Sequence, residues 1–242
     1  MSPVTTALVL RSGDFLFRWR SYLPLLLVPL VVVGIARFQY PFGSYATDLA
    51  WETACVLLAL AGVGIRVVTV GLAAPGTSGR NTRGQKARSL NTTGPYSVVR
   101  HPLYLGNFVV VLGLSLFPHA WIVPPLVAVL AAGYYACIAQ REEHFLREEF
   151  GPAFETWAAR VPAIVPALGR WAPPAWAFDG RAVLRREFYG LAVVLMTPFL
   201  LDIVEDLHET GRFDLDPVWT VIAALGAGTF VVLRVLKKRR PR

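Results

Sequence analysis

Six apolar runs, several of them close to the length of a membrane-spanning helix, constrain the fold of this 242-residue chain most. A helix needs about 20 apolar residues to cross a hydrocarbon core roughly 30 Å thick. Apolar residues make up 55% of the chain, a share typical of membrane proteins. The sequence therefore predicts an all-α, polytopic membrane helical bundle of about six spans. These spans are predicted at residues 23–35, 50–74, 103–117, 121–138, 188–204 and 218–236.

The basic residues predict how the bundle is oriented. Most of the 24 Lys and Arg residues lie in segments 1–22, 75–101 and 139–187 and at the C-terminal end. The positive-inside rule places these segments, and so both termini, in the cytosol. A net charge of +8 then reflects topology and anionic lipid headgroups rather than nucleic acid. The abundance of Ala and Arg favours a bacterial inner membrane.

Several single residues are expected to carry no chemistry. Cys55 and Cys137 fall inside apolar runs and are predicted to be buried free thiols, and no cluster of Cys and His has metal-ligand spacing. His119, His144 and His208 are predicted to be solvated. Three tryptophans are expected to anchor the outer interface, where spans begin: Trp51, Trp121 and Trp219.

The fourth predicted span is expected to continue beyond the membrane as a helix. No proline interrupts residues 126–150, and Gly151-Pro152 is a strong stop signal. A helix over residues 125–150 would extend about 39 Å at 1.5 Å per residue, more than the hydrocarbon thickness. Its last turns should reach the cytosol with Glu142 and Glu143, followed by a short amphipathic segment at residues 153–160.

The start of the third span carries a cluster of polar residues. Pro102 suits the first turn of a helix, where free N–H groups and the positive dipole end favour an anion. Arg100 and His101 add donors just before it, Tyr104 lies on the first turn, and Gly106 permits a close approach. Taken alone, these features are also typical of a basic flank, an interfacial aromatic residue and a helix-packing glycine.

One helical hairpin separates this cluster from Glu142 and Glu143, so both are predicted at the same membrane surface. Adjacent helical residues point about 100° apart, so only one glutamate is expected to face the helix cluster. A solvated helix end is the alternative interpretation. Arg66 is the only ionisable residue predicted well inside a span, which favours a functional site over a snorkelling side chain.

The motif Gly94-Pro95-Tyr96-Ser97-Val98-Val99-Arg100-His101-Pro102-Leu103-Tyr104-Leu105-Gly106, followed by Arg141-Glu142-Glu143, resembles the isoprenylcysteine carboxyl methyltransferase and phospholipid methyltransferase superfamily. The resemblance covers roughly residues 60–166. It implies an integral membrane methyltransferase that uses S-adenosylmethionine. It also implies that the cofactor is enclosed by Tyr96, Arg100, His101, Tyr104, Gly106, Glu142 and Glu143. The preceding stretch, residues 90–94, would help to wrap it.

We therefore expect methyl transfer at the cytosolic interface to a lipid or another hydrophobic acceptor, with Arg66 and Tyr104 as catalytic residues. An acceptor that is already anionic, such as a phosphate or carboxylate oxygen, needs no base, and the sequence offers no obvious dedicated one. The expected organisation is an N-terminal segment at 1–48, a methyltransferase core at 49–166 and a linker with a final helix pair at 167–242. The alternatives are an NADPH-dependent membrane reductase of the sterol reductase type and a non-catalytic scaffold or transporter; the oligomeric state stays open.

Overall fold

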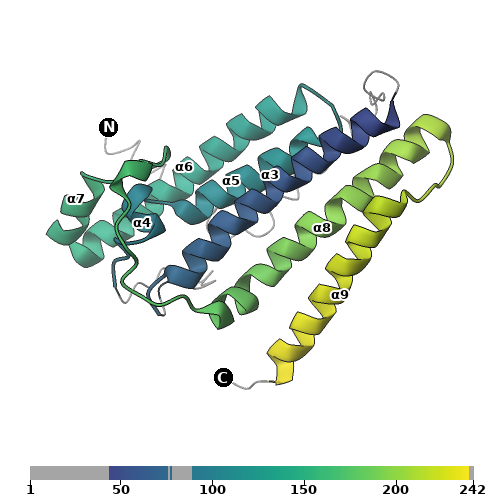
Figure 1. The fold of residues 1–242 in the computed structure, drawn as a ribbon. Coiled ribbons are helices and arrows are strands. Elements are labelled where there is room, and N and C mark those ends of the chain that lie inside the picture. Colours follow the sequence, from purple (N-terminus) through teal and green to yellow (C-terminus); the bar gives the residue numbers. More distant parts are fainter. Residues whose placement is uncertain (1–43, 76, 78–88, 240–242) are drawn as a thin grey trace.

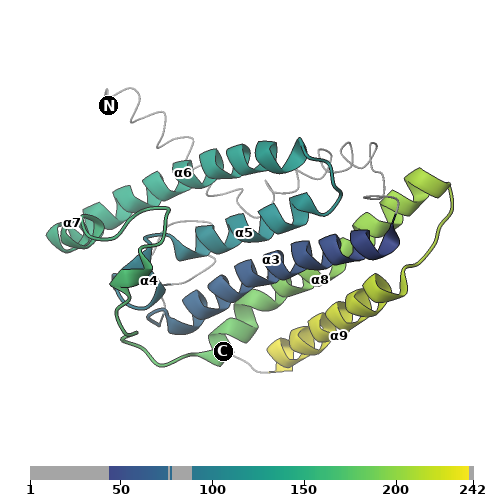
Figure 2. The same ribbon diagram turned by 45° about the horizontal axis from the view of Figure 1, so that its top comes forward.

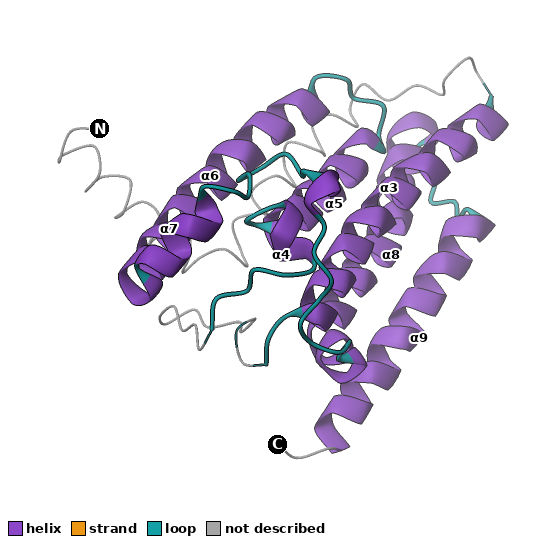
Figure 3. Cartoon of the chain, turned by 60° about the vertical axis from the view of Figure 1, so that its left-hand side comes forward, coloured by secondary structure: helices purple, strands orange, loops and turns teal. Residues whose placement is uncertain are grey.

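The computed structural model describes residues 44–75, 77 and 89–239, and every regular element in this part of the chain is a helix (Figure 1, Figure 3). The long helices are α3 (Tyr45–Leu72), α5 (Pro102–Leu116), α6 (Val123–Phe150), α8 (Gly180–Thr210) and α9 (Pro217–Arg239). Shorter elements are α4 (Pro95–Val98), α7 (Pro152–Ala158) and the 3₁₀ turn η3 (Leu168–Arg170). The predicted all-α class is confirmed over these residues.

Four of the helices are long and apolar enough to cross a membrane, namely α3, α6, α8 and α9. The helix α5 is also apolar but has 15 residues, shorter than a typical span. The predicted first span at 23–35 lies outside the described residues, so the count of six stays a prediction. The described helices nevertheless support an integral membrane protein.

The long helices pack in the spatial order α6, α5, α3, α8, α9, as Figure 2 shows. Close contact between α3 and α5 depends on small residues. A Cβ atom on Gly113 would lie 2.7 Å from the backbone nitrogen of Ala59 and from the carbonyl oxygen of Cys55. Only a glycine therefore allows the two backbones to approach this closely.

The ends of the helices follow local signals that are visible in the sequence. The ring of Pro102 occupies the first turn of α5, and Gly151 ends α6 with a φ of 50°, its N–H donating to the Arg147 carbonyl. The carboxylate of Asp179 caps α8 by accepting hydrogen bonds of 2.9 Å from the backbone N–H groups of Arg181 and Ala182. The predicted extension of the fourth span and the short helix after it are confirmed by α6 and α7.

Two helices are longer than the apolar runs that predicted them. The run at 50–74 belongs to Tyr45–Leu72, and the run at 188–204 belongs to Gly180–Thr210. Arg66 is therefore not the only ionisable residue within these two helices. Acidic residues also lie within these helices: Asp48, Glu52, Glu187, Asp202 and Glu205.

Two residues differ from their predicted surroundings. His119 was predicted to face solvent and Trp219 to lie at the membrane interface, but both side chains are largely buried and hydrogen-bonded. The imidazole Nε2 of His119 lies 2.9 Å from Asp48 Oδ1, and the His119 side chain is only 10% exposed. The indole of Trp219 is 1% exposed and donates to Glu52 Oε2 over 2.8 Å. Both predictions were wrong because the two side chains pack against other helices. Trp219 lies in an apolar cluster with Cys55 and Phe117, and carboxylates near the start of α3 supply hydrogen-bond partners for both residues. Cys55 is a buried free thiol, as predicted, whereas the free Cys137 is only half-buried.

Candidate active site

The imidazole of His101 joins the start of α5 to the end of α6. Its Nε2 atom lies 2.9 Å from Glu143 Oε1, and its Nδ1 atom lies 3.5 Å from Glu142 Oε2. Arg100 reinforces the contact by donating from Nη1 to Glu143 Oε2 over 2.8 Å. The predicted juxtaposition of the two sequence features, 42 positions apart, is present in the structure.

Both glutamates contact the same ring, so the expectation that only one of them faces the helix cluster is wrong. His101 contacts them with the two opposite nitrogens of its ring, and this accommodates two side chains that diverge along α6. The two carboxylates still differ in exposure, at 17% for Glu143 and 35% for Glu142. Glu143 is therefore the inner partner and Glu142 the outer one.

The charge of His101 depends on these two carboxylates. Burial opposes the charged imidazolium, but the hydrogen bonds to Glu142 and Glu143 outweigh it and raise the pKa of His101 to about 9. At neutral pH the ring is therefore protonated and donates from both nitrogens. Together with Arg100, the cluster holds two cations and two anions within hydrogen-bonding reach of one another.

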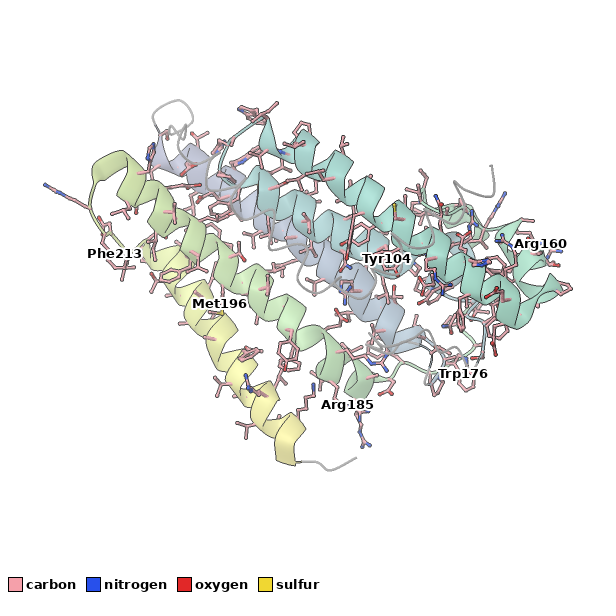
Figure 4. All side chains as sticks on the ribbon, turned by 180° about the vertical axis from the view of Figure 1, so that it is seen from behind. Tyr104, Arg160, Trp176, Arg185, Met196 and Phe213 are labelled. Atoms are coloured by element: carbon pink, nitrogen blue, oxygen red, sulfur yellow. The ribbon has the colours of Figure 1, made fainter. Side chains whose placement is uncertain are left out.

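Aromatic rings continue the site from His101 towards the middle of the bundle. The ring of Tyr104 stacks on His101 at a centroid distance of 5.5 Å and on Tyr135 of α6 at 5.4 Å. The Tyr135 side chain also lies near that of Asn107 on α5. Figure 4 labels Tyr104 where these helices lie side by side. A row of aromatic and amide groups thus connects the motif with Arg66.

Three helices meet at the guanidinium of Arg66. Its Nε and Nη2 atoms donate to the two carboxylate oxygens of Glu187 on α8 over 2.7 and 2.8 Å. Its Nη1 atom donates to Asn107 Oδ1 over 2.5 Å. The Glu187 side chain is 5% exposed and that of Arg66 is 20% exposed, so the pair is largely removed from water. Arg66 is a partnered residue rather than a snorkelling one.

Gly106 of the motif faces Arg66 across the contact between α3 and α5. A Cβ atom on Gly106 would lie 2.6 Å from Arg66 Cγ and 2.8 Å from the carbonyl oxygen of Gly62. The geometry gives Gly106 a packing role that places Arg66 close to the motif. Its predicted contact with a cofactor stays a prediction.

Tyr96 lies on α4, beside the clamp formed by His101 and the glutamates. Its carbonyl accepts a 3.0 Å hydrogen bond from the indole of Trp157, and its ring packs on the cluster that contains Phe154. Burial, followed by the negative charge of Glu142, raises the pKa of Tyr96. The structure therefore brings Tyr96 close to the other predicted cofactor residues.

Sequence reasoning missed three residues of this site: Asn107, Tyr135 and Glu187. Glu187 stands one position before the apolar run at 188–204 and was assigned to a cytosolic loop. A signal for it existed, because an arginine inside a span requires an anionic or carbonyl partner. No motif or spacing in the sequence marks Asn107 or Tyr135 as a site residue. Their role becomes visible only when α5 packs on α6. The described residues include no group of three or more His, Cys, Asp or Glu side chains that could hold a metal ion.

Comparisons with known proteins identify the family of the chain. Residues 51–153 match the family model described as phospholipid methyltransferase. The cobalt-zinc-cadmium resistance protein CzcN of Cupriavidus metallidurans is 32% identical over 171 residues, which cover 68% of this chain and 77% of the relative. The nickel-cobalt-cadmium resistance protein NccN of Alcaligenes xylosoxydans xylosoxydans is 34% identical over 138 residues, or 57% of this chain and 62% of the relative.

A named methyltransferase is also among the relatives. Protein-S-isoprenylcysteine O-methyltransferase B of Arabidopsis thaliana is 32% identical over 84 residues, which cover 35% of this chain and 43% of that protein. No solved structure matches the chain. The fold and site are those of a helical membrane protein with a polar cluster at one end of a hairpin. The chain belongs to the isoprenylcysteine carboxyl methyltransferase and phospholipid methyltransferase superfamily.

The chain spans about three fifths of the length of NccN and less than half of that of the named methyltransferase. The family model ends at residue 153, before α8 begins at Gly180. Glu187 therefore comes from a helix outside the matched segment, although it contacts Arg66 inside that segment. The helix α8 therefore contributes directly to the candidate site.

Proposed function

We propose that the protein transfers a methyl group from S-adenosylmethionine to a lipid or another membrane-partitioned acceptor at the cytosolic membrane interface. The observation that carries this proposal is the His101 clamp, which joins Glu142 and Glu143 to the motif at the start of α5. The density of Lys and Arg in the flanking segments supports a cytosolic location for this end and for both termini.

The clamp suits the amino-acid part of such a cofactor, because that part carries both an ammonium and a carboxylate. Glu142 is the more exposed carboxylate and can accept from an ammonium group. Arg100 uses Nη1 for Glu143, and its other N–H groups can donate to a carboxylate. We propose that Tyr96 and Tyr104 bound the same pocket, and that Gly106 brings α3 close to it.

The cofactor, when bound, supplies a methyl group on a positively charged sulfur. During transfer the bond between sulfur and methyl carbon breaks, its electron pair stays on sulfur, and a new bond forms to the acceptor. The protein then contributes mainly by orientation and exclusion of water. The stacked rings of Tyr104 and Tyr135 supply apolar walls for that purpose.

Arg66 is the residue that we propose to orient the acceptor. Three of its five N–H donors contact Glu187 and Asn107, and the two others can donate to an acceptor oxygen. A phosphate or carboxylate oxygen remains the favoured nucleophile, since it needs no base. Glu187 offsets the charge of Arg66, so we expect a singly charged headgroup rather than a multiply charged one.

The test begins with ligand binding to the purified protein in nanodiscs. Saturable binding of S-adenosylhomocysteine, weakened by Glu142→Gln and unchanged by Glu149→Gln on the exposed side of α6, is the expected result. Binding of NADPH in its place would favour the reductase alternative, and binding of neither would favour a non-catalytic protein. Lipids from cells with and without the protein are then compared by mass spectrometry for a species heavier by one methylene unit, the net gain on methylation.

A further inference from the structure

The segment that connects α7 to α8 leaves an unusual number of large apolar side chains exposed. We call residues 162–178 the strap. Its exposed side chains are Ile164 (71%), Val165 (75%), Leu168 (75%), Trp171 (50%), Trp176 (49%) and Phe178 (54%). Exposed apolar groups gathered in one short segment are typical of a surface that contacts another protein or a membrane.

The strap is held in place by its backbone rather than by burial of these side chains. The backbone N–H of Ala167 donates to the Val98 carbonyl over 2.9 Å, and the carbonyl of Ala172 accepts from the Gly94 N–H over 3.0 Å. The Ala172 N–H donates to the Ser97 hydroxyl over 2.9 Å. The strap therefore runs along the 93–100 segment as a fixed element, while its apolar side chains stay exposed.

The strap also continues directly into a membrane helix. The Asp179 N–H donates to the Gly71 carbonyl over 2.8 Å, and the ring of Phe178 lies against Gly71 near the end of α3. The helix α8, which is long and apolar enough to cross a membrane, starts at Gly180. The strap thus lies at the level where two membrane helices reach the interface, at the end of the molecule opposite Phe213 (Figure 4).

Charge identifies the kind of surface that the strap fits. No acidic residue occurs between Glu155 and Asp179. Four exposed arginines lie in the strap or beside it: Arg160, Arg170, Arg181 and Arg185. Apolar and aromatic side chains among arginines match a bilayer interface, in which apolar groups enter the acyl boundary and arginines meet anionic headgroups.

We propose that the strap is a docking surface for the anionic lipid headgroups of the membrane that α8 spans. The proposal does not depend on the methyltransferase chemistry, because it rests only on exposure, charge and continuity with α8. It has a consequence for the site, since the same strap holds the 93–100 segment that carries Tyr96 and Arg100. Lipid that binds the strap would therefore also stabilise the position of the 93–100 segment.

The experiment uses the full chain in nanodiscs of phosphatidylcholine with and without phosphatidylglycerol. Tryptophan fluorescence is quenched by phosphatidylcholine brominated at shallow or deep acyl positions, and by aqueous iodide. The double variant Trp171→Phe/Trp176→Phe isolates the strap signal by difference. The matched control is Trp157→Phe, which removes an indole that is 9% exposed and bonded to the Tyr96 carbonyl.

The expected result is that the strap signal is quenched by the shallow brominated lipid, less by the deep one and little by iodide. Phosphatidylglycerol should increase the shallow quenching, and Arg160→Gln/Arg170→Gln should abolish that increase. Quenching by iodide without quenching by brominated lipid would overturn the proposal and favour a protein partner. Shallow quenching that is the same with and without phosphatidylglycerol would overturn the proposal that the strap binds anionic lipid. Binding of S-adenosylhomocysteine is measured separately, so failure of the proposed function is recognised independently.

Discussion

The carboxylate of Glu187 holds the guanidinium of Arg66 through two hydrogen bonds of 2.7 and 2.8 Å, although 121 positions separate the residues in the sequence. Side-on pairing of this kind fixes the plane of the guanidinium as well as its position. Because Glu187 lies on α8 and Arg66 on α3, the pair links the segment that matches the family with the helix pair that follows it.

Replacement of Glu187 should therefore weaken both stability and turnover. Glu187→Gln leaves the Arg66 charge without its buried partner, at a cost of about 3 kcal/mol. The midpoint of thermal unfolding in nanodiscs measures this loss, with Glu149→Gln on the exposed face of α6 as the control. An equal midpoint in the two variants would contradict the importance of the pair. Glu187→Asp should recover part of the loss, since it restores the charge.

Arg66→Leu should abolish methyl transfer while leaving the binding of S-adenosylhomocysteine largely intact. The reason is that the clamp residues lie near the start of α5, whereas Arg66 contacts Asn107 and Glu187 further along the bundle. The measurement is titration with S-adenosylhomocysteine combined with mass spectrometry of lipids. Normal turnover in this variant would contradict the proposal that Arg66 orients the methyl acceptor. Arg234→Leu, at an exposed position of α9, is the matched control.

The stability of the protein should fall at alkaline pH because of His101. Its pKa is raised from 6.5 to about 9 in the folded state, so the stability that it contributes is complete below pH 6.5. That contribution is lost as the pH rises through about 9. Thermal unfolding between pH 6 and pH 10 should show the loss, and His101→Gln should flatten it. A His101→Gln profile as steep as that of the unchanged protein would refute this assignment.

Glu143 should matter mainly for stability, and Glu142 mainly for cofactor binding. Glu143 contacts both Arg100 and His101, so Glu143→Gln should lower the thermal stability more than Glu142→Gln does. Glu142 is the more exposed carboxylate, so Glu142→Gln should mainly weaken the binding of S-adenosylhomocysteine. Thermal unfolding and ligand titration of both variants separate the two effects. The reverse pattern would exchange the proposed roles.

Gly106→Ala should destabilise the contact between α3 and α5. The added Cβ atom would meet Arg66 Cγ at 2.6 Å and the Gly62 carbonyl at 2.8 Å, and overpacking of this kind costs about 1–3 kcal/mol. Gly133→Ala is the matched control, because a Cβ atom at this position of α6 would meet nothing within 4 Å. That control should be neutral or slightly stabilising, as alanine favours helix. Equal thermal midpoints in the two variants would argue against a tight contact at Gly106.

The parts of the structure that depend on local signals were predictable from the sequence. The start of α5 at Pro102, the extension of α6 to Gly151 and the proximity of His101 to Glu143 follow from proline, glycine and hairpin length. Parts that depend on contacts between distant segments were not. The partner of Arg66 lies just outside an apolar run, and the indole of Trp219 donates to Glu52, 167 positions away. Apolar patterning locates helices, but it does not determine which polar side chains meet across them.

The hydrogen bond from the Asp179 N–H to the Gly71 carbonyl, with Phe178 packed beside it, fixes where α8 begins relative to the end of α3. It also sets the rotation of α8, and so the direction in which Glu187 projects. One residue inserted between Asp179 and Glu187 would turn that carboxylate about 100° around the helix axis and away from Arg66. The segment between Asp179 and Glu187 should therefore tolerate substitutions far better than insertions or deletions.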